Sequence, residues 1–330
     1  MSAAELLVRT LRKPESAVAL DAEGWQGLIG AARAEQLIGT LAARLHGLAL
    51  PGTVRAILAD AAAAAEQGRV AALWEAEMVR RALAPVGCPV VLLKGTAFLA
   101  AGLSAGRGRA VGDTDILVPR ASLPEVERAL LASGWEWVKR DPYDDRYYRE
   151  WMHELPPLIH RERDRMVDVH HTILPPTARV RPDAAAMIAD AAPLGKGLSV
   201  LAPADMIVHA AAHLFADGDL SGGLRNLWDI HRLIEEFGTD ALEERADRHG
   251  LRPAVHRAAR QAGELFGASI PENWRNWDSL DPLFRRRLLA RDGWGRGTRP
   301  VTRFGFYVRS HWIRMPPHLL ARHLWTKWRR

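Results

Sequence analysis

An apolar segment that carries two acidic residues is the most restrictive feature of this chain. The segment DTDILV (113–118) places Asp113 and Asp115 two residues apart in what reads as a buried strand. Side chains alternate across a strand, so both carboxylates project from the same face. Two neighbouring acids on a buried strand repel each other and are costly to desolvate, and a bound divalent cation relieves both problems. The alternative is that each aspartate is a strand-edge or turn residue.

A second apolar segment, MVDVHH (166–171), supplies a third acid. Asp168 lies between two valines, so its carboxylate points to one face of its own strand. Mg²⁺ prefers oxygen ligands, and three strand-borne carboxylates can hold one or two such ions for phosphoryl or nucleotidyl transfer. The same alternation puts His170 on the Asp168 face, where we expect it to contact the nucleotide or the acceptor.

A strand-to-helix turn precedes these acids. Residues 90–93 form a short apolar run, which indicates a buried strand, and KGT (94–96) then opens a helical pattern. Glycine lets the backbone approach a ligand closely, and free N–H groups at a helix start favour phosphate. The loop SAGRGRAVG (104–112) adds arginines that either neutralise a triphosphate or are solvated loop charges. We predict four nucleotide-binding residues: Lys94, Gly95, Thr96 and Arg109.

The sequence pattern divides the chain into four regions. Leucine and alanine at three- and four-residue spacing predict helices over residues 1–84. Short apolar runs and turns over 85–178 predict an α+β core with a small mixed sheet, in which the polar stretch 141–151 reads as a loop or an irregular helix start. A helical pattern returns over 179–290, and a basic, aromatic tail occupies 291–330.

The tail holds most of the excess positive charge. The chain has 45 Lys and Arg against 39 Asp and Glu, a formal net charge of +6, and ten of the basic residues but only one acid fall in 291–330. The rest of the chain is therefore slightly acidic, which does not support nucleic-acid binding by the body. The tail is open to four interpretations: an interfacial helix on anionic lipid, a nucleic-acid contact, docking on the acidic body, or a solvated end.

The cysteine content and the hydropathy of the sequence indicate the cellular compartment in which we expect the protein. Cys88 is the one cysteine, so neither an internal disulfide nor a thiolate metal site is possible. No apolar run reaches the roughly 20 residues that cross a bilayer, and no signal-peptide core follows the N-terminus. We expect a cytoplasmic protein without a transmembrane segment.

Two helical pairs have simpler interpretations than a site. His209 and His213 are four apart on a predicted helix, which is possible metal-ligand spacing, although packing or hydrogen bonding beside the cleft is the simpler role. Arg225 and Asp229 are most simply an ion pair between residues four apart on one helix.

Taken as a set, these motifs resemble a known family. LLKG (92–95), then Arg109 four residues before DTDILV, then VDVHH (167–171) are similar to the uncharacterised nucleotidyltransferase family of the polymerase-beta superfamily. The resemblance covers roughly residues 20–240. It implies that the first two aspartates hold Mg²⁺, or Mn²⁺, and that Asp168 completes the metal site or activates the acceptor. The superfamily's Gly-Ser phosphate turn resembles Gly95-Thr96, with threonine in place of serine.

The sequence therefore predicts a nucleotidyltransferase-type α+β fold flanked by helical regions. We expect Mg²⁺-dependent transfer of a nucleoside monophosphate from an NTP, with ATP as the expected donor, to a hydroxyl of a small molecule, peptide, protein or RNA. Asp113, Asp115 and Asp168 are the predicted catalytic residues and metal ligands. The alternatives are a catalytically silent member that binds or regulates a partner, and a nucleic-acid or membrane-surface binder that acts through residues 291–330.

Overall fold

A layer of helices opens the fold. The computed structural model describes residues 1–328, so Arg329 and Arg330, at the end of the predicted tail, lie outside the described residues. Leucine and alanine supply most of the buried side chains of this first region, as their spacing predicts. Its helices are α1 (Ala3–Arg12), α2 (Ala22–Ala34), α3 (Ile38–Arg44) and α4 (Gly52–Leu83), with a 3₁₀ turn η1 (Pro14–Ala17) after α1.

A seven-stranded mixed sheet forms the core, with the strand order β3-β4-β5-β2-β1-β7-β6. The pairs β2/β5 and β1/β7 are parallel and the remaining pairs are antiparallel, including the hairpin of β4 and β5. The predicted α+β class is thus confirmed: one mixed sheet flanked by helical regions. The strands are β1 (Val90–Leu92), β2 (Asp113–Leu117), β3 (Trp135–Trp137), β4 (Leu158–His160), β5 (Met166–His170), β6 (Ala192–Gly195) and β7 (Leu198–Val200).

The segments between the strands are helical. α5 follows β1 directly, as the strand-to-helix pattern predicts, and α6 covers the stretch between β2 and β3. They are α5 (Lys94–Ala100), α6 (Leu123–Ala132), α7 (Pro142–Trp151) and α8 (Ala184–Ala189), with 3₁₀ turns η2 (Ala84–Val86), η3 (Ser104–Gly106) and η4 (Arg120–Ser122).

Two parts of the sequence prediction are wrong here. The hairpin of β6 and β7 lies where a purely helical region was expected from residue 179, so the sheet continues past residue 178. Its apolar strand is only three residues long, too short to show a period, and it is held in place by parallel pairing with β1. The stretch 141–151, expected as a loop or an irregular helix start, contains the regular helix α7, which the side chain of Asp141 caps.

Helices again complete the chain. α9 and α10 lie where the amphipathic patterns predict them, and a π-helical turn, η5 (Ala212–Asp217), extends α9. The elements are α9 (Pro203–Ala211), α10 (Gly223–Phe237), α11 (Leu242–Arg248), α12 (Arg252–Phe266), the 3₁₀ turn η6 (Glu272–Trp274), α13 (Asp281–Leu288), α14 (Pro300–Arg314) and α15 (Pro317–Trp328).

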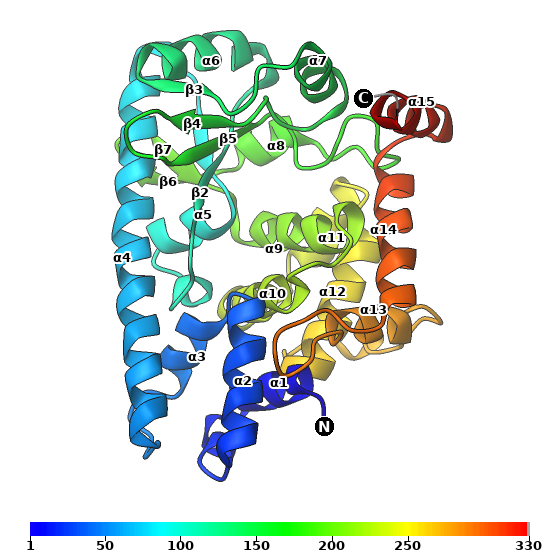
Figure 1. The fold of residues 1–330 in the computed structure, drawn as a ribbon. Coiled ribbons are helices and arrows are strands. Elements are labelled where there is room, and N and C mark those ends of the chain that lie inside the picture. The colour runs from blue at the N-terminus through cyan, green and yellow to red at the C-terminus, as the bar shows by residue number, and fades with distance from the viewer. Residues whose placement is uncertain (329–330) are drawn as a thin grey trace.

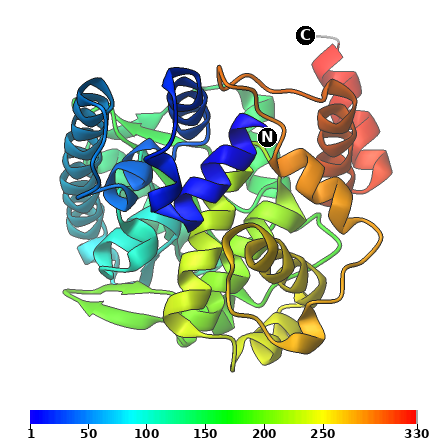
Figure 2. The same ribbon diagram turned by 90° about the horizontal axis from the view of Figure 1, so that it is seen from below.

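The helices surround the sheet unevenly. The 32-residue helix α4 runs along one edge of the molecule, and α14 with α15 lies along the opposite edge in both views (Figures 1 and 2). Helices α9 to α12 fill the space between these edges, below the sheet in Figure 1. The predicted basic tail is therefore helical along most of its length. It docks on the body through an ion pair of Arg314 with Asp217. Within the described residues, no helix is long and apolar enough to span a membrane.

Candidate active site

The three predicted acids converge at the centre of the sheet. Asp115 on β2 and Asp168 on β5 are direct partners in the parallel register of the two strands. Asp113 precedes Asp115 by two residues and so shares its face. One carboxylate oxygen from each of the three aspartates lies within 4.8 Å of those of the other two. The alternation predicted from sequence thus brings residues from two separate segments into one cluster.

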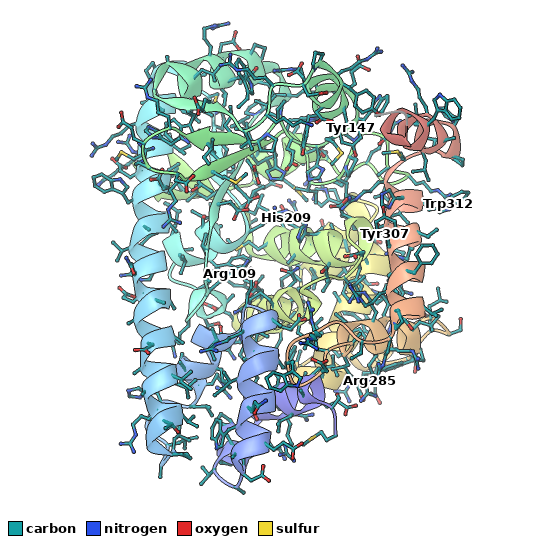
Figure 3. The ribbon with its side chains drawn as sticks, viewed as in Figure 1. Arg109, Tyr147, His209, Arg285, Tyr307 and Trp312 are labelled. Atoms are coloured by element: carbon teal, nitrogen blue, oxygen red, sulfur yellow. The ribbon has the colours of Figure 1, made fainter. Side chains whose placement is uncertain are left out.

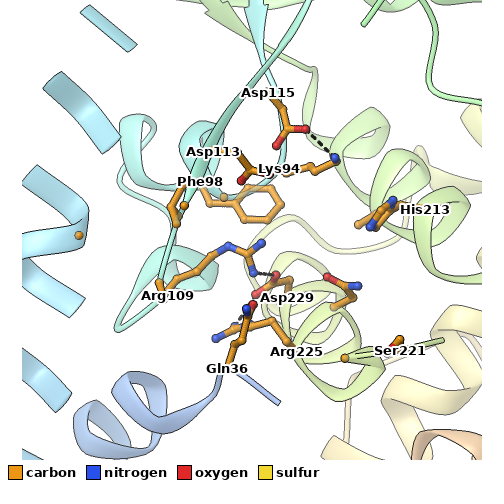
Figure 4. A pocket seen from close by; sticks show the side chains of 18 of the residues that line it. Gln36, Lys94, Phe98, Arg109, Asp113, Asp115, His213, Ser221, Arg225 and Asp229 are labelled. Atoms are coloured by element: carbon orange, nitrogen blue, oxygen red, sulfur yellow. Dashed lines mark hydrogen bonds and ion pairs between the residues drawn. The ribbon is translucent and has the colours of Figure 1, made fainter. Parts of the chain in front are cut away.

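One lysine and one histidine contact the innermost acid. Lys94 Nζ donates to Asp115 Oδ1 at 2.6 Å (Figure 4), and His170 Nε2 lies 3.0 Å from the same oxygen. His170 Nε2 is also 3.5 Å from Glu154 Oε2, a carboxylate that the sequence analysis missed. Glu154 reaches the cluster because its backbone forms an isolated bridge with His170. His170 therefore joins two acids rather than one.

Charge is unevenly neutralised within the cluster. Burial, reinforced by the charges of Asp115 and Glu154, raises the pKa of Asp168 to about 7. Burial and the charge of Asp115 also raise the pKa of Asp113. Burial alone would raise the pKa of Asp115 too, but Lys94 and His170 outweigh it and hold that pKa well below its usual range. Asp115 thus stays ionised, while the two acids beside it bind protons more readily than usual.

The turn after β1 is shaped to hold Lys94 against the acids. Lys94 has a φ of +49°, in the left-handed region that non-glycine residues rarely adopt. A Cβ on Gly95 would lie 2.5 Å from Arg109 Nε, so only glycine fits where the arginine crosses the turn. Thr96 is fully buried and its hydroxyl donates to the backbone carbonyl of Asp113 at 3.2 Å. The threonine side chain therefore anchors the start of β2 and does not face the cavity.

Arg109 belongs to a buried ion-pair chain. Its guanidinium donates to Asp229, which also accepts from Arg225 on the same helix, so the predicted pairing of Arg225 with Asp229 is confirmed. Arg225 continues to Thr40 Oγ1 at 2.6 Å, and Thr40 in turn donates to the carbonyl of Arg107 at 3.2 Å. The side chain of Arg107 is exposed. The ion pair thus holds the Arg109 side chain in place, whereas Arg107 takes part in the chain of contacts only through its backbone carbonyl.

Close backbone contact holds the arginine loop on the N-terminal helices. A Cβ on Gly39 of α3 would lie 2.5 Å from the carbonyl oxygen of Gly108, and a Cβ on Gly108 would lie 2.3 Å from that of Gly39. Gly108 also has a φ of +68°. Neither position has room for a side chain, so the loop that carries Arg109 is packed directly against α3.

A cavity of about 910 Å³ opens beside the acids. The sheet and turn contribute acids and a lysine to one wall, and α10 with the arginine loop contributes cations to the facing wall (Figure 4). Helices α2 and α4 close a third side. Asp168 and His170 do not line the cavity, but both adjoin Asp115, which does. The charged and polar lining residues are Lys94, Asp113, Asp115, Arg109, Arg225, Asp229, Arg291, Gln36, His209, His213, Ser221 and Asn226.

Both histidines of the helical pair face this cavity. His209, on α9, lies in the central region of the molecule that Arg109 also approaches (Figure 3). His213 follows in the π-helical turn. Burial and the nearby Lys94 lower the pKa of His209, and they lower that of His213 to about 4, so both imidazoles are neutral at pH 7. Neither belongs to the residue groups of the described chain that are placed to hold a metal ion.

The carboxylate cluster fits a divalent cation. Asp168 Oδ1 is buried, and no group in residues 1–328 donates a hydrogen bond to it. A buried acceptor without a partner is costly, and a cation on the shared face of the three acids would satisfy it. Asp113, Asp115 and Asp168 supply the oxygen ligands that Mg²⁺ and Mn²⁺ prefer.

Several residues of the site have no motif in the sequence. Glu154, which contacts His170 but does not line the cavity, lies in an irregular segment, and Arg225 and Arg291 are more than a hundred residues from Asp113 and Asp115. For Arg225 the sequence predicts only the ion pair, because a basic residue four positions before an acid on a helix can pair with it. The same spacing does not predict that both residues face a cavity. Arg291 pairs with Glu35, which joins two distant regions at the cavity rim.

The sequence comparisons agree with this geometry. The model of the uncharacterised nucleotidyltransferase family matches residues 21–267, most of the chain. The chain belongs to this family. The match contains all three aspartates, the Lys94 turn and the helices that line the cavity. No curated protein matches the sequence. Family membership supports nucleotidyl transfer as the reaction class and an NTP as a substrate.

Proposed function

We propose that this family member is a magnesium-dependent nucleotidyltransferase that moves a nucleoside monophosphate from an NTP, with ATP as the expected donor, to an acceptor hydroxyl. The observation that carries the proposal is the convergence of Asp113, Asp115 and Asp168 on one face of the sheet, beside a cavity whose other wall is cationic. The acceptor's class stays open among small molecules, peptides, proteins and RNA ends.

The three aspartates would hold Mg²⁺. When bound, the ion neutralises the phosphate oxygens and favours departure of pyrophosphate. In the proposed reaction the acceptor oxygen forms a bond to the α-phosphorus, and the bond from that phosphorus to the bridging oxygen breaks. Asp168 is the proposed acceptor of the hydroxyl proton. Asp168 adjoins both other acids, and its Oδ1 is buried without a hydrogen-bond partner among the described residues.

The cationic wall and Lys94 on the facing wall are the proposed phosphate site. Arg109 and Arg225 line the cationic wall, and Arg109 Nε is buried without a hydrogen-bond partner among the described residues. A phosphate oxygen would satisfy this donor. Gly95 would support this site by leaving room for the Arg109 side chain, which crosses the turn where a Cβ would lie. Thr96 would support this site indirectly, by fixing the strand that carries Asp113.

Calorimetric titration with ATP and Mg²⁺ tests the site. The double variant Asp113→Asn/Asp115→Asn should lose Mg²⁺-dependent ATP binding, because it removes two of the three ionised ligands. Asp219→Asn, an acid in the loop before α10 that does not line this cavity, is the matched control and should bind as the parent does. Unchanged binding in the double variant would refute the proposed metal site. A pyrophosphate-release assay over candidate acceptors then tests transfer itself.

One observation favours the silent alternative. Lys94 Nζ occupies a bonding position on Asp115, and a lysine on a metal-ligand carboxylate can replace the ion. Lys94→Met distinguishes the two functions. If Lys94 acts on phosphate in an active enzyme, the variant loses turnover. If it stands in for the metal in a silent binding protein, the variant binds Mg²⁺ more tightly than the parent, and the parent releases no pyrophosphate.

A further inference from the structure

Helix α14 turns an apolar stripe toward solvent. Val301, Phe304, Val308 and Trp312 recur at spacings of three and four residues, so they share one helical face. Their exposed fractions are 84, 67, 49 and 47%. Trp312 lies at the outer edge of the molecule in Figure 3. Single exposed apolar residues are normal, but a continuous stripe along one helix marks an interaction surface.

The opposite face fixes this helix to the body. Phe306 and Ser310 are buried, and the Phe306 ring packs edge-on against that of Phe284, with 5.0 Å between centroids. At the end of the helix, Arg314 Nε donates to Asp217 Oδ1 at 2.8 Å, and its carbonyl accepts from Thr177 Oγ1 at 2.7 Å. The helix has thus already buried its inward face, so the outer stripe is a second apolar surface.

Positive charge that no carboxylate neutralises lies at the first turn of α14. No acid occurs in the sequence after Asp292. Arg299 donates to the carbonyl of Arg286 at 2.7 Å, and Arg303 donates to the carbonyl of Gly297 at 3.3 Å. Within the described residues, neither arginine pairs with a carboxylate. The base of α14 therefore presents apolar side chains beside cations that are bonded only to neutral groups.

We propose that α14 docks this protein on an anionic lipid surface, with the stripe inserted at the headgroup boundary and the arginines on the phosphates. A helix with an apolar aromatic outer face and arginines at its first turn is suited to that interface. Nucleic acid is a poorer fit, because the two valines and the phenylalanine of the stripe have no partner on a phosphate backbone. This surface lies away from the cavity and does not depend on the proposed reaction.

Sedimentation of the full-length chain with lipid vesicles tests the proposal. The parent should bind vesicles of phosphatidylcholine mixed with phosphatidylglycerol, and binding should weaken as salt rises. Phe304→Asp/Trp312→Asp should reduce the affinity for these vesicles by at least about tenfold, because it places charge in the inserted face. Trp74→Asp is the matched control: Trp74 is 56% exposed on α4, at the opposite edge, and its variant should bind as the parent does.

Four outcomes would overturn the proposal. The first two are that the parent would fail to sediment with anionic vesicles, or that the double variant would bind them as well as the parent does. The third is that a short DNA duplex would bind the parent with the same dependence on Phe304 and Trp312, which would assign the surface to nucleic acid. The fourth is that light scattering would show a parent dimer that the double substitution dissociates, which would assign the surface to a second copy of the chain. Thermal melting and ATP binding of the double variant should match the parent and so verify its fold.

Discussion

Buried acids in the helical part of this molecule and those in the sheet have opposite surroundings. Asp281 at the start of α13 accepts from Arg257 at 2.9 Å and from Arg260 at 2.6 Å. Asp205 on α9 is fully buried and is paired with both Arg245 and His249. In the sheet, by contrast, Lys94 and His170 both contact Asp115. Neither Asp113 nor Asp168 forms an ion pair with another described residue.

This difference in pairing distinguishes acids that stabilise the fold from acids that are available to bind a ligand. A buried carboxylate that meets two cations is already satisfied, and its removal leaves the cations unpaired. A cluster with more acids than cations is destabilised in the metal-free protein and gains stability when a cation binds. Asp205 and Asp281 should therefore matter for stability, and the sheet acids for binding.

The largest effect on stability is expected at Asp281. Asp281→Ala removes the fully buried carboxylate that Arg257 and Arg260 share and leaves them only the more exposed Asp278. The loss should lower the free energy of unfolding by about 3–4 kcal/mol. Urea denaturation followed by circular dichroism measures the loss. A loss below about 1 kcal/mol would show that the helical acids are not structural, and the comparison with the sheet would fail.

Acid pH should reveal the same pairing at Asp205. Burial alone would raise the pKa of Asp205, but hydrogen bonds from His249 and Arg245 outweigh it and lower that pKa. The stabilisation from ionised Asp205 is therefore complete above the pKa of an aspartate in the unfolded chain, about 3.9. It is lost as the pH falls through the lower pKa of Asp205 in the folded protein. Asp205→Asn should cost about 2–3 kcal/mol at pH 7. In urea denaturation this difference from the parent should shrink steadily below about pH 4, and a difference independent of pH would contradict the assignment.

Asp168→Asn should act in the opposite direction. The pKa of Asp168 is raised to about 7, so the metal-free folded state binds this proton more tightly than the unfolded chain and loses stability as the pH rises from about 4 to 7. The amide of the variant has no charge to bury, so Asp168→Asn should raise the free energy of unfolding of the metal-free protein by about 1–2 kcal/mol at pH 8. Below pH 4 the variant and the parent should be equally stable. Thermal melting with and without Mg²⁺ measures this, and Mg²⁺ should raise the melting temperature of the parent more than that of the variant.

The smallest effect is expected from an uncharged contact. Thr96→Val removes the hydroxyl that donates to the Asp113 carbonyl, with little change of shape, and should cost about 1 kcal/mol of stability. Mg²⁺-dependent ATP binding should weaken only slightly, which calorimetry can measure. A loss of binding as complete as that of the double aspartate variant would show that the threonine contacts the nucleotide directly.

The sequence predicts those parts of the fold and the site whose signals are local. Alternation along a strand places Asp113 with Asp115, and Asp168 with His170, without reference to any other segment. A strand followed at once by glycine and a helical pattern likewise predicts the turn at Lys94. Periodicity also predicts α9 and α10, which are long enough to show it.

The remaining features depend on pairing between distant segments. The strands β6 and β7 are short and are joined at a turn that contains Gly195 and Gly197, and β7 is specified by its partner β1 rather than by its own pattern. The parallel register that sets Asp115 against Asp168 cannot be read from either strand alone. Glu154 enters the site through a single backbone bridge to His170. Helix α7 is different, because Asp141 before a proline is a helix-start signal that the aromatic composition obscured.

The contact between Gly39 and Gly108 has a consequence for how the cavity can vary. Since two main chains meet there without side chains, the spacing between α3 and the arginine loop is set by backbone atoms alone. Substitutions of residues that line the cavity change which chemical groups face a ligand, but they do not change the spacing between α3 and the arginine loop. Selectivity can therefore change through the lining side chains while the backbone that carries Arg109 keeps its position on α3.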